Sequence, residues 1–293
     1  PNGHEESPSI ILKGHNRHSG YDRHGMAIEG AGDFDGDGFN DLLVAARNDD
    51  SPSSYASLFL DPEGCAGGGN NTGFVSVYRG RSDGTFDTEP AFFFQGPQAT
   101  EGIRSLKGNL DINGDGLRDF IAGDRDWSRP GQSSAGGFSV VFGRPHVASL
   151  DDNETTLTDV ICETDLTYVG LIASDNLAGE DAITSLGDLN NDGCDDFAVG
   201  AYGEDFANAT QGSVRVFFGW GGAGCPSAPS MLTLIPYLNG AQTGYGLAGG
   251  EDLNGDGVND LVIGGPRLTV AGDTTGAAWL VSGAYLLTLT PEA

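Results

Sequence analysis

A nine-residue acidic pattern recurs four times and constrains the fold more than any other feature of this sequence. Its first copy runs from Asp33 to Asp41, with Asp or Asn at positions 1, 3, 5 and 9 and Gly at position 6. The later copies begin at Asp111, Asp188 and Asp252, at spacings of 78, 77 and 64 residues. Self-similarity at a period of several tens of residues is typical of repeat architectures, so we expect four copies of one structural unit.

The pattern is typical of a loop that wraps oxygen ligands around a hard cation, and calcium is the expected occupant of each of four sites. Alternate side chains supply oxygens, position 7 supplies its backbone carbonyl, and the Gly allows a sharp turn. No Lys or Arg lies among the ligand positions to offset the repulsion between carboxylates. The predicted ligands are Asp33, Asp35, Asp37, Phe39 and Asp41; Asp111, Asn113, Asp115, Leu117 and Asp119; Asp188, Asn190, Asp192, Cys194 and Asp196; and Asp252, Asn254, Asp256, Val258 and Asp260.

These loops are not EF-hands, and their repetition favours a structural role. An EF-hand needs a bidentate Glu at position 12 and flanking helices. Position 12 is instead Val44, Ala122, Val199 or Ile263, each within an apolar run that indicates a strand. A catalytic metal needs an open coordination position beside an acid, base or nucleophile, whereas one similar loop per repeat indicates a fastening for each unit.

Each loop lies within the same order of apolar segments. In the third unit we expect strands at 168–172, at 182–186 leading into the loop, at 197–201 directly after it, and at 212–218. The 48 glycines also favour strands and tight turns over helices. Four-stranded antiparallel units in series form the blades of a β-propeller. We therefore expect an all-β fold and a single domain over 1–293, with repeat units at approximately 1–85, 86–148, 149–222 and 223–293.

The order of these segments resembles the FG-GAP repeat of integrin α subunits. The resemblance is clearest in the third copy, from 187–193 through 199–203 to 212–217. It implies a calcium-binding β-propeller, which has seven blades in integrins. Only four units are found here, so we expect four blades, with additional degenerate blades or part of a seven-bladed propeller as the alternative. Strands at 9–12 and 285–289 are expected to join the last blade to the first.

Composition limits the partners and the compartment. With 42 acidic and 14 basic residues, the chain is not expected to bind nucleic acid or an anionic membrane surface. It has no apolar run of 18 residues and no signal-peptide pattern, so we expect no membrane insertion. Cys65, Cys162, Cys194 and Cys225 allow two disulfides in three pairings and fit no zinc pattern. Calcium and disulfides together favour a secreted or cell-surface protein.

Ligand recognition is expected in the connecting loops that differ between units. Loops at one rim of a propeller converge, and an aromatic side chain flanked by Arg and Asp can stack on a sugar and bond its hydroxyls. Trp127, within the segment 124–130, is the first candidate. By resemblance to integrin heads and fungal propeller lectins, the ligand would be an extracellular protein or a glycan. We therefore expect a binding module for adhesion or carbohydrate/protein recognition, and not an enzyme.

Two alternatives stay open. A polysaccharide lyase or hydrolase would need paired carboxylates or a Tyr/His/Arg cluster outside the acidic loops. The sequence shows no such group of residues at a recognisable spacing. The Gly-x-Ser-x-Gly match at 80–84 lies between two predicted strands, so it indicates a turn and not a nucleophile. The other alternative is a purely structural repeat domain of a larger secreted protein. Oligomeric state is not determined by these patterns.

Overall fold

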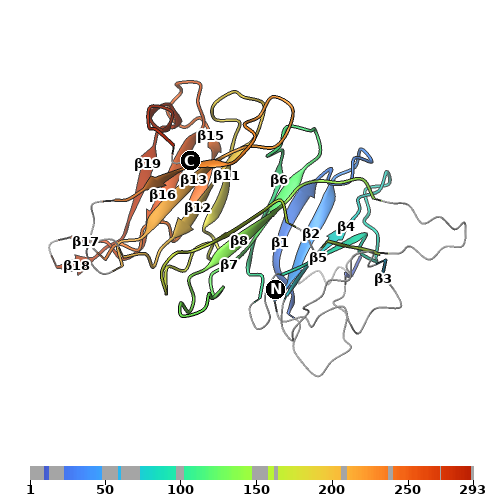
Figure 1. The fold of residues 1–293 in the computed structure, drawn as a ribbon, viewed down its shortest axis with the longest axis horizontal. Coiled ribbons are helices and arrows are strands. Elements are labelled where there is room, and N and C mark those ends of the chain that lie inside the picture. Colours follow the sequence, from blue (N-terminus) through green and yellow to red (C-terminus); the bar gives the residue numbers. More distant parts are fainter. Residues whose placement is uncertain are drawn as a thin grey trace, which may run out of the picture.

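The computed structural model describes residues 10–12, 23–47, 59–60, 73–96, 102–146, 158–161, 164–205, 210–236, 240–270 and 272–291. Within them the strands form four main antiparallel sheets, which lie side by side along the longest axis of the molecule (Figure 1). We number these sheets blades 1 to 4. The prediction of an all-β fold built from antiparallel propeller blades is confirmed.

Blades 1 and 2 each contain four antiparallel strands, and two further strands extend the edge of blade 1. Blade 1 contains β1 (His24–Gly32), β2 (Asp41–Ala46), β4 (Phe74–Tyr78) and β5 (Phe92–Gln95), and β9 (Thr158–Ile161) and β3 (Phe59–Leu60) extend it by parallel pairing. Blade 2 contains β6 (Ser105–Leu110), β7 (Asp119–Asp124), β8 (Gly137–Val141) and β10 (Leu166–Val169).

Blade 3 repeats the same order of four strands, and blade 4 has only the first three of them in the described residues. Blade 3 contains β11 (Ile183–Gly187), β12 (Asp196–Ala201), β13 (Ser213–Phe218) and β14 (Ser230–Leu234). Blade 4 contains β15 (Leu247–Glu251), β16 (Asp260–Gly265) and β19 (Ala277–Val281), with a short hairpin of β17 (Thr269–Val270) and β18 (Asp273–Thr274) between the last two. The helix α1 (Gly283–Leu286) follows β19.

The strands predicted near the two ends of the chain are not found in the described residues. Residues 10–12 carry no strand, and residue 9 lies outside the described residues. The segment 285–289 was expected as a strand, but it begins inside α1 and continues as turns. Leu286 and Leu289 are three residues apart, a helical spacing that places both in the core between blades 3 and 4.

Successive blades are held together by three apolar cores. Leu43 and Val77 of blade 1 pack with Phe120 of blade 2, and the same arrangement recurs between blades 2 and 3 and between blades 3 and 4. The first strands of the blades, β1, β6, β11 and β15, neighbour one another in that order. No helix in the described part of the chain is long and apolar enough to cross a membrane.

Candidate functional site

The four acidic loops occupy the same place in every blade. Each joins the first strand to the second, so that position 9 is the first residue of β2, β7, β12 or β16. Neighbouring loops are also bonded to each other: the Arg118 amide donates to the Asp33 carbonyl (3.0 Å) and the Asp195 amide to the Asp111 carbonyl (2.8 Å). The predicted ligand sets of loops 1, 2 and 3 therefore form a connected row across the blades.

Backbone hydrogen bonds give the four loops one shape. The amide of position 6 donates to the carboxylate of position 1, and the amide of position 7 donates to the side chain of position 5. The Gly at position 6 has a φ between 88° and 92° in every loop, a left-handed conformation that strains any other residue. The position-6 bonds are Gly38 to Asp33 (3.0 Å), Gly116 to Asp111 (3.1 Å), Gly193 to Asp188 (2.9 Å) and Gly257 to Asp252 (2.9 Å).

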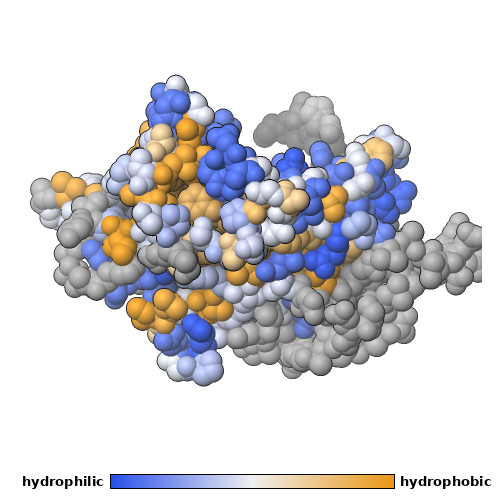
Figure 2. Space-filling model, turned by 45° about the horizontal axis from the view of Figure 1, so that its top comes forward, coloured by the Kyte–Doolittle hydropathy of each residue, from blue (hydrophilic) through white to orange (hydrophobic). Residues whose placement is uncertain are grey.

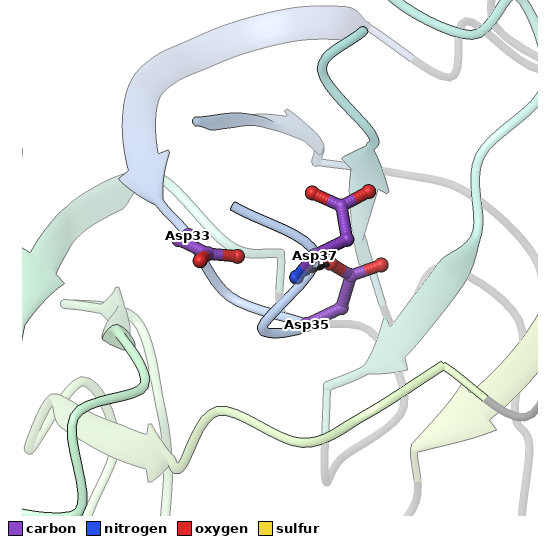
Figure 3. A group of neighbouring side chains, drawn as sticks. All are labelled: Asp33, Asp35 and Asp37. Carbon is purple, nitrogen blue, oxygen red and sulfur yellow. Dashed lines mark hydrogen bonds between the residues drawn. The ribbon is translucent and has the colours of Figure 1, made fainter. Parts of the chain in front are cut away.

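Loops 1 and 2 fit a hard cation because they leave carboxylate oxygens without hydrogen-bond partners. Oδ1 of Asp33 and Oδ1 of Asp111 are buried and accept no hydrogen bond. In loop 1, oxygens of Asp33, Asp35 and Asp37 lie within 4.8 Å of one another on the turn that follows β1 (Figure 3). Burying an unpaired carboxylate oxygen is costly, and a calcium ion coordinated by such oxygens would offset that cost.

The position-9 carboxylate has a second role that sequence reasoning missed. It is buried in all four loops, and each of its two oxygens accepts a backbone amide, one from position 2 and one from the Gly that follows the third strand of the blade. These bonds are Asp41 to Phe34 (3.0 Å) and Gly80 (2.9 Å), Asp119 to Ile112 (2.7 Å) and Gly143 (2.8 Å), Asp196 to Leu189 (3.0 Å) and Gly219 (2.8 Å), and Asp260 to Leu253 (3.0 Å) and Gly283 (3.0 Å).

This carboxylate therefore ties each loop to the segment that follows the third strand of its own blade. Burial raises the pKa of Asp41, Asp119 and Asp196 to about 7, against the opposing effect of their amide donors. A carboxylate oxygen has two lone pairs, so these bonds leave capacity for a cation. The sequence signal that could have revealed the bond is the Gly that follows the third strand of every unit, within two residues of its end.

Loop 1 differs from the others because a cation from the same blade lies against it. Arg79 follows β4 and pairs through Nε with Oδ2 of Asp35 (2.7 Å) and through Nη2 with Oδ2 of Asp37 (2.6 Å). The sequence places no basic residue among the ligand positions, but the fold brings one from 42 residues away. We expect calcium to compete with Arg79 here, so loop 1 is expected to be the weakest of the four sites.

Loop 3 is braced by a disulfide. Cys194, at position 7, is bonded to Cys225, and the two Cα atoms are 6.0 Å apart. Sγ of Cys225 lies 3.1 Å from the Asn113 carbonyl oxygen, so the disulfide contacts loop 2 as well. Sequence reasoning left three pairings open. Cys65 and Cys162 lie outside the described residues.

A second group of polar side chains gathers at the opposite ends of these strands. We call it the rim cluster and define it as Arg47, Arg104, Asp124, Arg125, Asp126, Glu180, Tyr202 and Tyr245. Arg104 precedes β6 and Asp124 ends β7; both are buried, with Nε 3.5 Å from Oδ1. Arg104 also pairs with Asp126, which lies 3.6 Å from Arg47 of blade 1.

The exposed part of the rim cluster combines charge with aromatic rings. Nη1 of Arg125 lies 2.8 Å from Oε2 of Glu180, in the segment leading to β11, and 3.5 Å from the Tyr202 hydroxyl. The Tyr202 ring lies 5.0 Å from the ring of Tyr245, which is 45% exposed. Trp127, the aromatic residue favoured from the sequence, is only 5% exposed and lies over Gly137. It cannot offer its ring face to a ligand.

The buried carboxyl of Asp124 predicts a pH-dependent stability. Burial raises its pKa from 3.8 to about 7, although Arg47 opposes the shift. Between these values the folded protein keeps a proton that the unfolded chain has released, so the free energy of unfolding falls as pH rises from about 4 to 7. Asp124→Asn should remove this contribution, which is at most ~1.4 kcal/mol per pH unit. Melting curves of both proteins between pH 5 and 8 in excess calcium test it; parallel curves would contradict it.

Comparison with known proteins finds one repeat family and several relatives that are similar to part of this chain. A model of the FG-GAP repeat matches residues 182–217 and 243–281, which contain loops 3 and 4. Integrin alpha-5 of Xenopus laevis is 30% identical over 204 residues, which are 67% of this chain and 17% of that protein. Integrin alpha-IIb of Mus musculus is 31% identical over 156 residues, or 53% of this chain and 14% of that protein.

A different class of protein carries a similar region. Phosphatidylinositol-glycan-specific phospholipase D of Homo sapiens is 31% identical over 163 residues, which are 54% of this chain and 18% of that protein. The chain thus spans less than a fifth of the length of these relatives. The similarity concerns one part of each of them.

Proposed function

The chain is an integrin-like propeller of FG-GAP repeats, and from this premise we propose that it is an extracellular binding module. Calcium ions would hold the blades, and the rim cluster would take the ligand. The observation that carries this proposal is the separation of the two groups: similar loops in all four blades at one end of the strands, and a varied, partly exposed set of side chains at the other. We expect ligand binding in the loops that differ between blades, because acidic loops of the same kind in every blade offer no selectivity for a particular ligand.

The proposed calcium ligands are the twenty residues predicted from the sequence. Positions 1, 3 and 5 supply side-chain oxygens, position 7 supplies a carbonyl, and position 9 adds an oxygen while it keeps its backbone bonds. We propose a structural role at all four sites, since the loops have the same hydrogen-bonding frame and no rim residue belongs to them. A secreted or cell-surface location supplies the millimolar calcium that such sites need.

The chemistry of the rim cluster suits a glycan. The exposed ring of Tyr245 can stack on the apolar face of a sugar, while Arg125 donates and Glu180 accepts hydrogen bonds from hydroxyls. The buried pair of Arg104 and Asp124 underneath would fix these groups in place, which lowers the entropy lost on binding. An extracellular protein with a polar, sugar-like contact surface is the second class of partner.

Substitution of Tyr245 tests this assignment. Tyr245→Ala should weaken glycan binding by up to about tenfold, because stacking on an aromatic ring contributes about 0.5–1.5 kcal/mol beyond area burial. Tyr285→Ala is the matched control, since Tyr285 is similarly exposed but lies on α1, away from the rim cluster. Binding would be measured on a glycan array and then by calorimetry with the best sugar, in calcium. Equal loss in both variants, or no binding by the wild type to any sugar, would contradict a glycan ligand at this site.

One observation favours a second candidate, a polysaccharide-active enzyme. The fold brings together two carboxyl groups, two guanidinium groups and a tyrosine from four separate segments of the sequence: Asp124, Glu180, Arg104, Arg125 and Tyr202. Asp124 is nevertheless buried, so the binding role has the better support. Release of shortened sugars from a bound polysaccharide, lost in Glu180→Gln, would establish the enzyme instead.

A further inference from the structure

One carboxylate of the rim cluster, that of Asp126, is shared by three guanidinium groups. Oδ2 of Asp126 lies 3.6 Å from Nη2 of Arg47, and Oδ1 lies 3.8 Å from Nε of Arg125. Oδ2 also pairs with Nη2 of Arg104. A carboxylate has about four lone-pair sites, whereas three guanidinium groups carry roughly fifteen N–H donors. Asp126 therefore cannot satisfy its three neighbours alone.

Positive charge is in excess around this carboxylate. Burial lowers the pKa of Arg47, and the nearby like charges of Arg23 and Arg125 act in the same direction. Burial also raises the pKa of Asp124 to about 7, so this carboxyl group is partly protonated at neutral pH. Among the described residues, the charged groups gathered here are Arg23, Arg47, Arg104 and Arg125 against Asp124, Asp126 and Glu180. A local surplus of positive charge is notable in a chain of formal charge −28.

The three guanidinium groups divide into an inner one and two outer ones. The side chain of Arg104 is only 7% exposed, and its Nε donates no hydrogen bond within the described residues. The side chains of Arg47 and Arg125 are 23% and 29% exposed. Arg104 therefore holds Asp126 from inside, while Arg47 and Arg125 present N–H groups to the solvent.

We propose that the rim cluster prefers sugars that carry a carboxylate, and that Arg47 and Arg125 bind this carboxylate beside Asp126. The inference rests on the glycan-binding role proposed above and adds the charge of the ligand. A guanidinium group matches the two oxygens of a carboxylate, and such charge-assisted hydrogen bonds are about twice as strong as neutral ones. Asp126 is itself an example of a carboxylate seated among these groups.

The aromatic part of the rim cluster continues from the same arginine. Nη1 of Arg125 lies 3.5 Å from the Tyr202 hydroxyl, and the Tyr202 ring lies 5.0 Å from the ring of Tyr245. A sugar whose carboxylate is bound by Arg125 would direct its ring, or the next ring of the chain, toward these tyrosines. One ligand could therefore use the charged and the aromatic part together.

The acidic side chains that remain favour a carboxylate over a phosphate. Asp126 and Glu180 are each 38% exposed and would stay close to the bound anion. A phosphate group carries a charge of about −1.5 to −2 at neutral pH, so they would repel it up to about twice as strongly as a carboxylate.

The acidic loops are too far away to oppose this binding. The strand β7 separates Asp119 of loop 2 from Asp124 of the rim cluster by five residue steps, or about 17 Å. The screening length at physiological salt is about 8 Å, half of that distance. Figure 2, in which the acidic-loop end comes forward, shows several hydrophilic patches, in blue, on that side. The charges of these loops are therefore largely screened at the rim.

Titration calorimetry in calcium with matched pairs of sugars tests the proposal. The acids are sialyllactose, trigalacturonic acid and a hyaluronan tetrasaccharide, each paired with its methyl ester, which keeps the sugar rings and removes the charge. The wild type should bind at least one acid about tenfold more tightly than its ester, because charge-assisted hydrogen bonds replace neutral ones. This preference should shrink as NaCl is raised from about 0.05 to 0.5 M.

Arg47→Gln and Asp126→Asn should change the affinity for the acid in opposite directions. Arg47→Gln removes one outer guanidinium group, so most of the preference should disappear while the affinity for the ester stays the same. Asp126→Asn removes the competing carboxylate, so the acid should bind roughly fivefold more tightly. Arg144→Gln is the matched control, since Arg144 is also half-buried but pairs with Asp165 at the acidic-loop end and should leave both affinities unchanged.

The outcomes separate this proposal from the glycan-binding role on which it rests. Equal affinity for acid and ester, or tighter binding of the ester, overturns the preference for a carboxylate and leaves a neutral glycan as the ligand. A preference that Arg47→Gln leaves intact overturns it as well, because the carboxylate would then bind elsewhere. No binding of any sugar at about 5 mM overturns the glycan-binding role itself. Melting curves in calcium confirm that each variant folds; Arg47→Met, which keeps an apolar stem, replaces Arg47→Gln if it does not.

Discussion

Removal of calcium is expected to lower the melting temperature of this protein by about 10 °C. Each site contributes ~1.4 kcal/mol for every tenfold excess of calcium over its dissociation constant. Extracellular calcium modules have dissociation constants near 10⁻⁴–10⁻³ M, so about 10 mM calcium gives at least this excess. Loops 2, 3 and 4 together then contribute about 4 kcal/mol, and a chain of this size loses roughly 2–4 °C per kcal/mol.

Differential scanning calorimetry in calcium and in EDTA measures this effect. Magnesium at the same concentration is the control, because it demands a tighter octahedral site and dehydrates reluctantly. It should restore little of the lost stability. Arg79→Gln provides a second comparison: without the guanidinium beside Asp35 and Asp37, loop 1 should bind calcium more tightly, and the difference between the two melts should widen. An identical melting temperature in EDTA and calcium would contradict the assignment of all four loops.

The periodic features of the chain could be predicted from the sequence because they depend on neighbours in the chain. A run of alternating acids with a Gly at position 6 folds through bonds within nine residues, as between Gly38 and Asp33. The apolar strands on either side repeat with the loop, so four blades could be counted. The segment 285–289 was assigned wrongly because a short apolar run fits a strand or a helix equally well, and packing of Leu286 decides between them.

The parts that sequence reasoning missed are contacts between distant segments. Arg79 reaches loop 1 from the end of β4, and Glu180 of blade 3 meets Arg125 of blade 2 only because the first strands of these blades are neighbours. The exposed tyrosine pair was missed for the same reason, since Tyr202 and Tyr245 come from blades 3 and 4. Trp127 follows Arg125 and Asp126 in the sequence, as a sugar-binding aromatic residue could, but its large apolar ring favours burial in the fold.

Replacement of the position-9 carboxylate is expected to destabilise the protein even when calcium is absent. Asp119 is fully buried and accepts the amides of Ile112 (2.7 Å) and Gly143 (2.8 Å). Asp119→Ala leaves both amides buried without an acceptor, at a cost of about 1–3 kcal/mol each. We therefore expect a loss of about 3–5 kcal/mol in EDTA, and a larger loss in calcium because the variant also loses a ligand of site 2.

Asp115→Ala is the matched variant because it removes a ligand of the same site from an exposed position. Asp115 accepts the Leu117 amide (2.8 Å) and an amide proton of Asn113 (2.9 Å), but water can replace both bonds at the surface. Its loss of stability in EDTA should stay below about 1 kcal/mol. In calcium it should lose the contribution of site 2, as Asp119→Ala does.

The pair of variants separates the two roles of the loop, fastening a blade and binding a cation. The free energy of unfolding, measured by urea denaturation in EDTA, reports the first role because no cation is present. Calcium affinity, measured by titration calorimetry, reports the second. If the position-9 carboxylate only bound the cation, both variants would have the wild-type free energy of unfolding in EDTA and a lower one only in calcium. A gap of several kcal/mol between them in EDTA would establish Asp119 as the link between the loop and the Gly143 end of β8, and calcium as a further constraint on a turn that is already built.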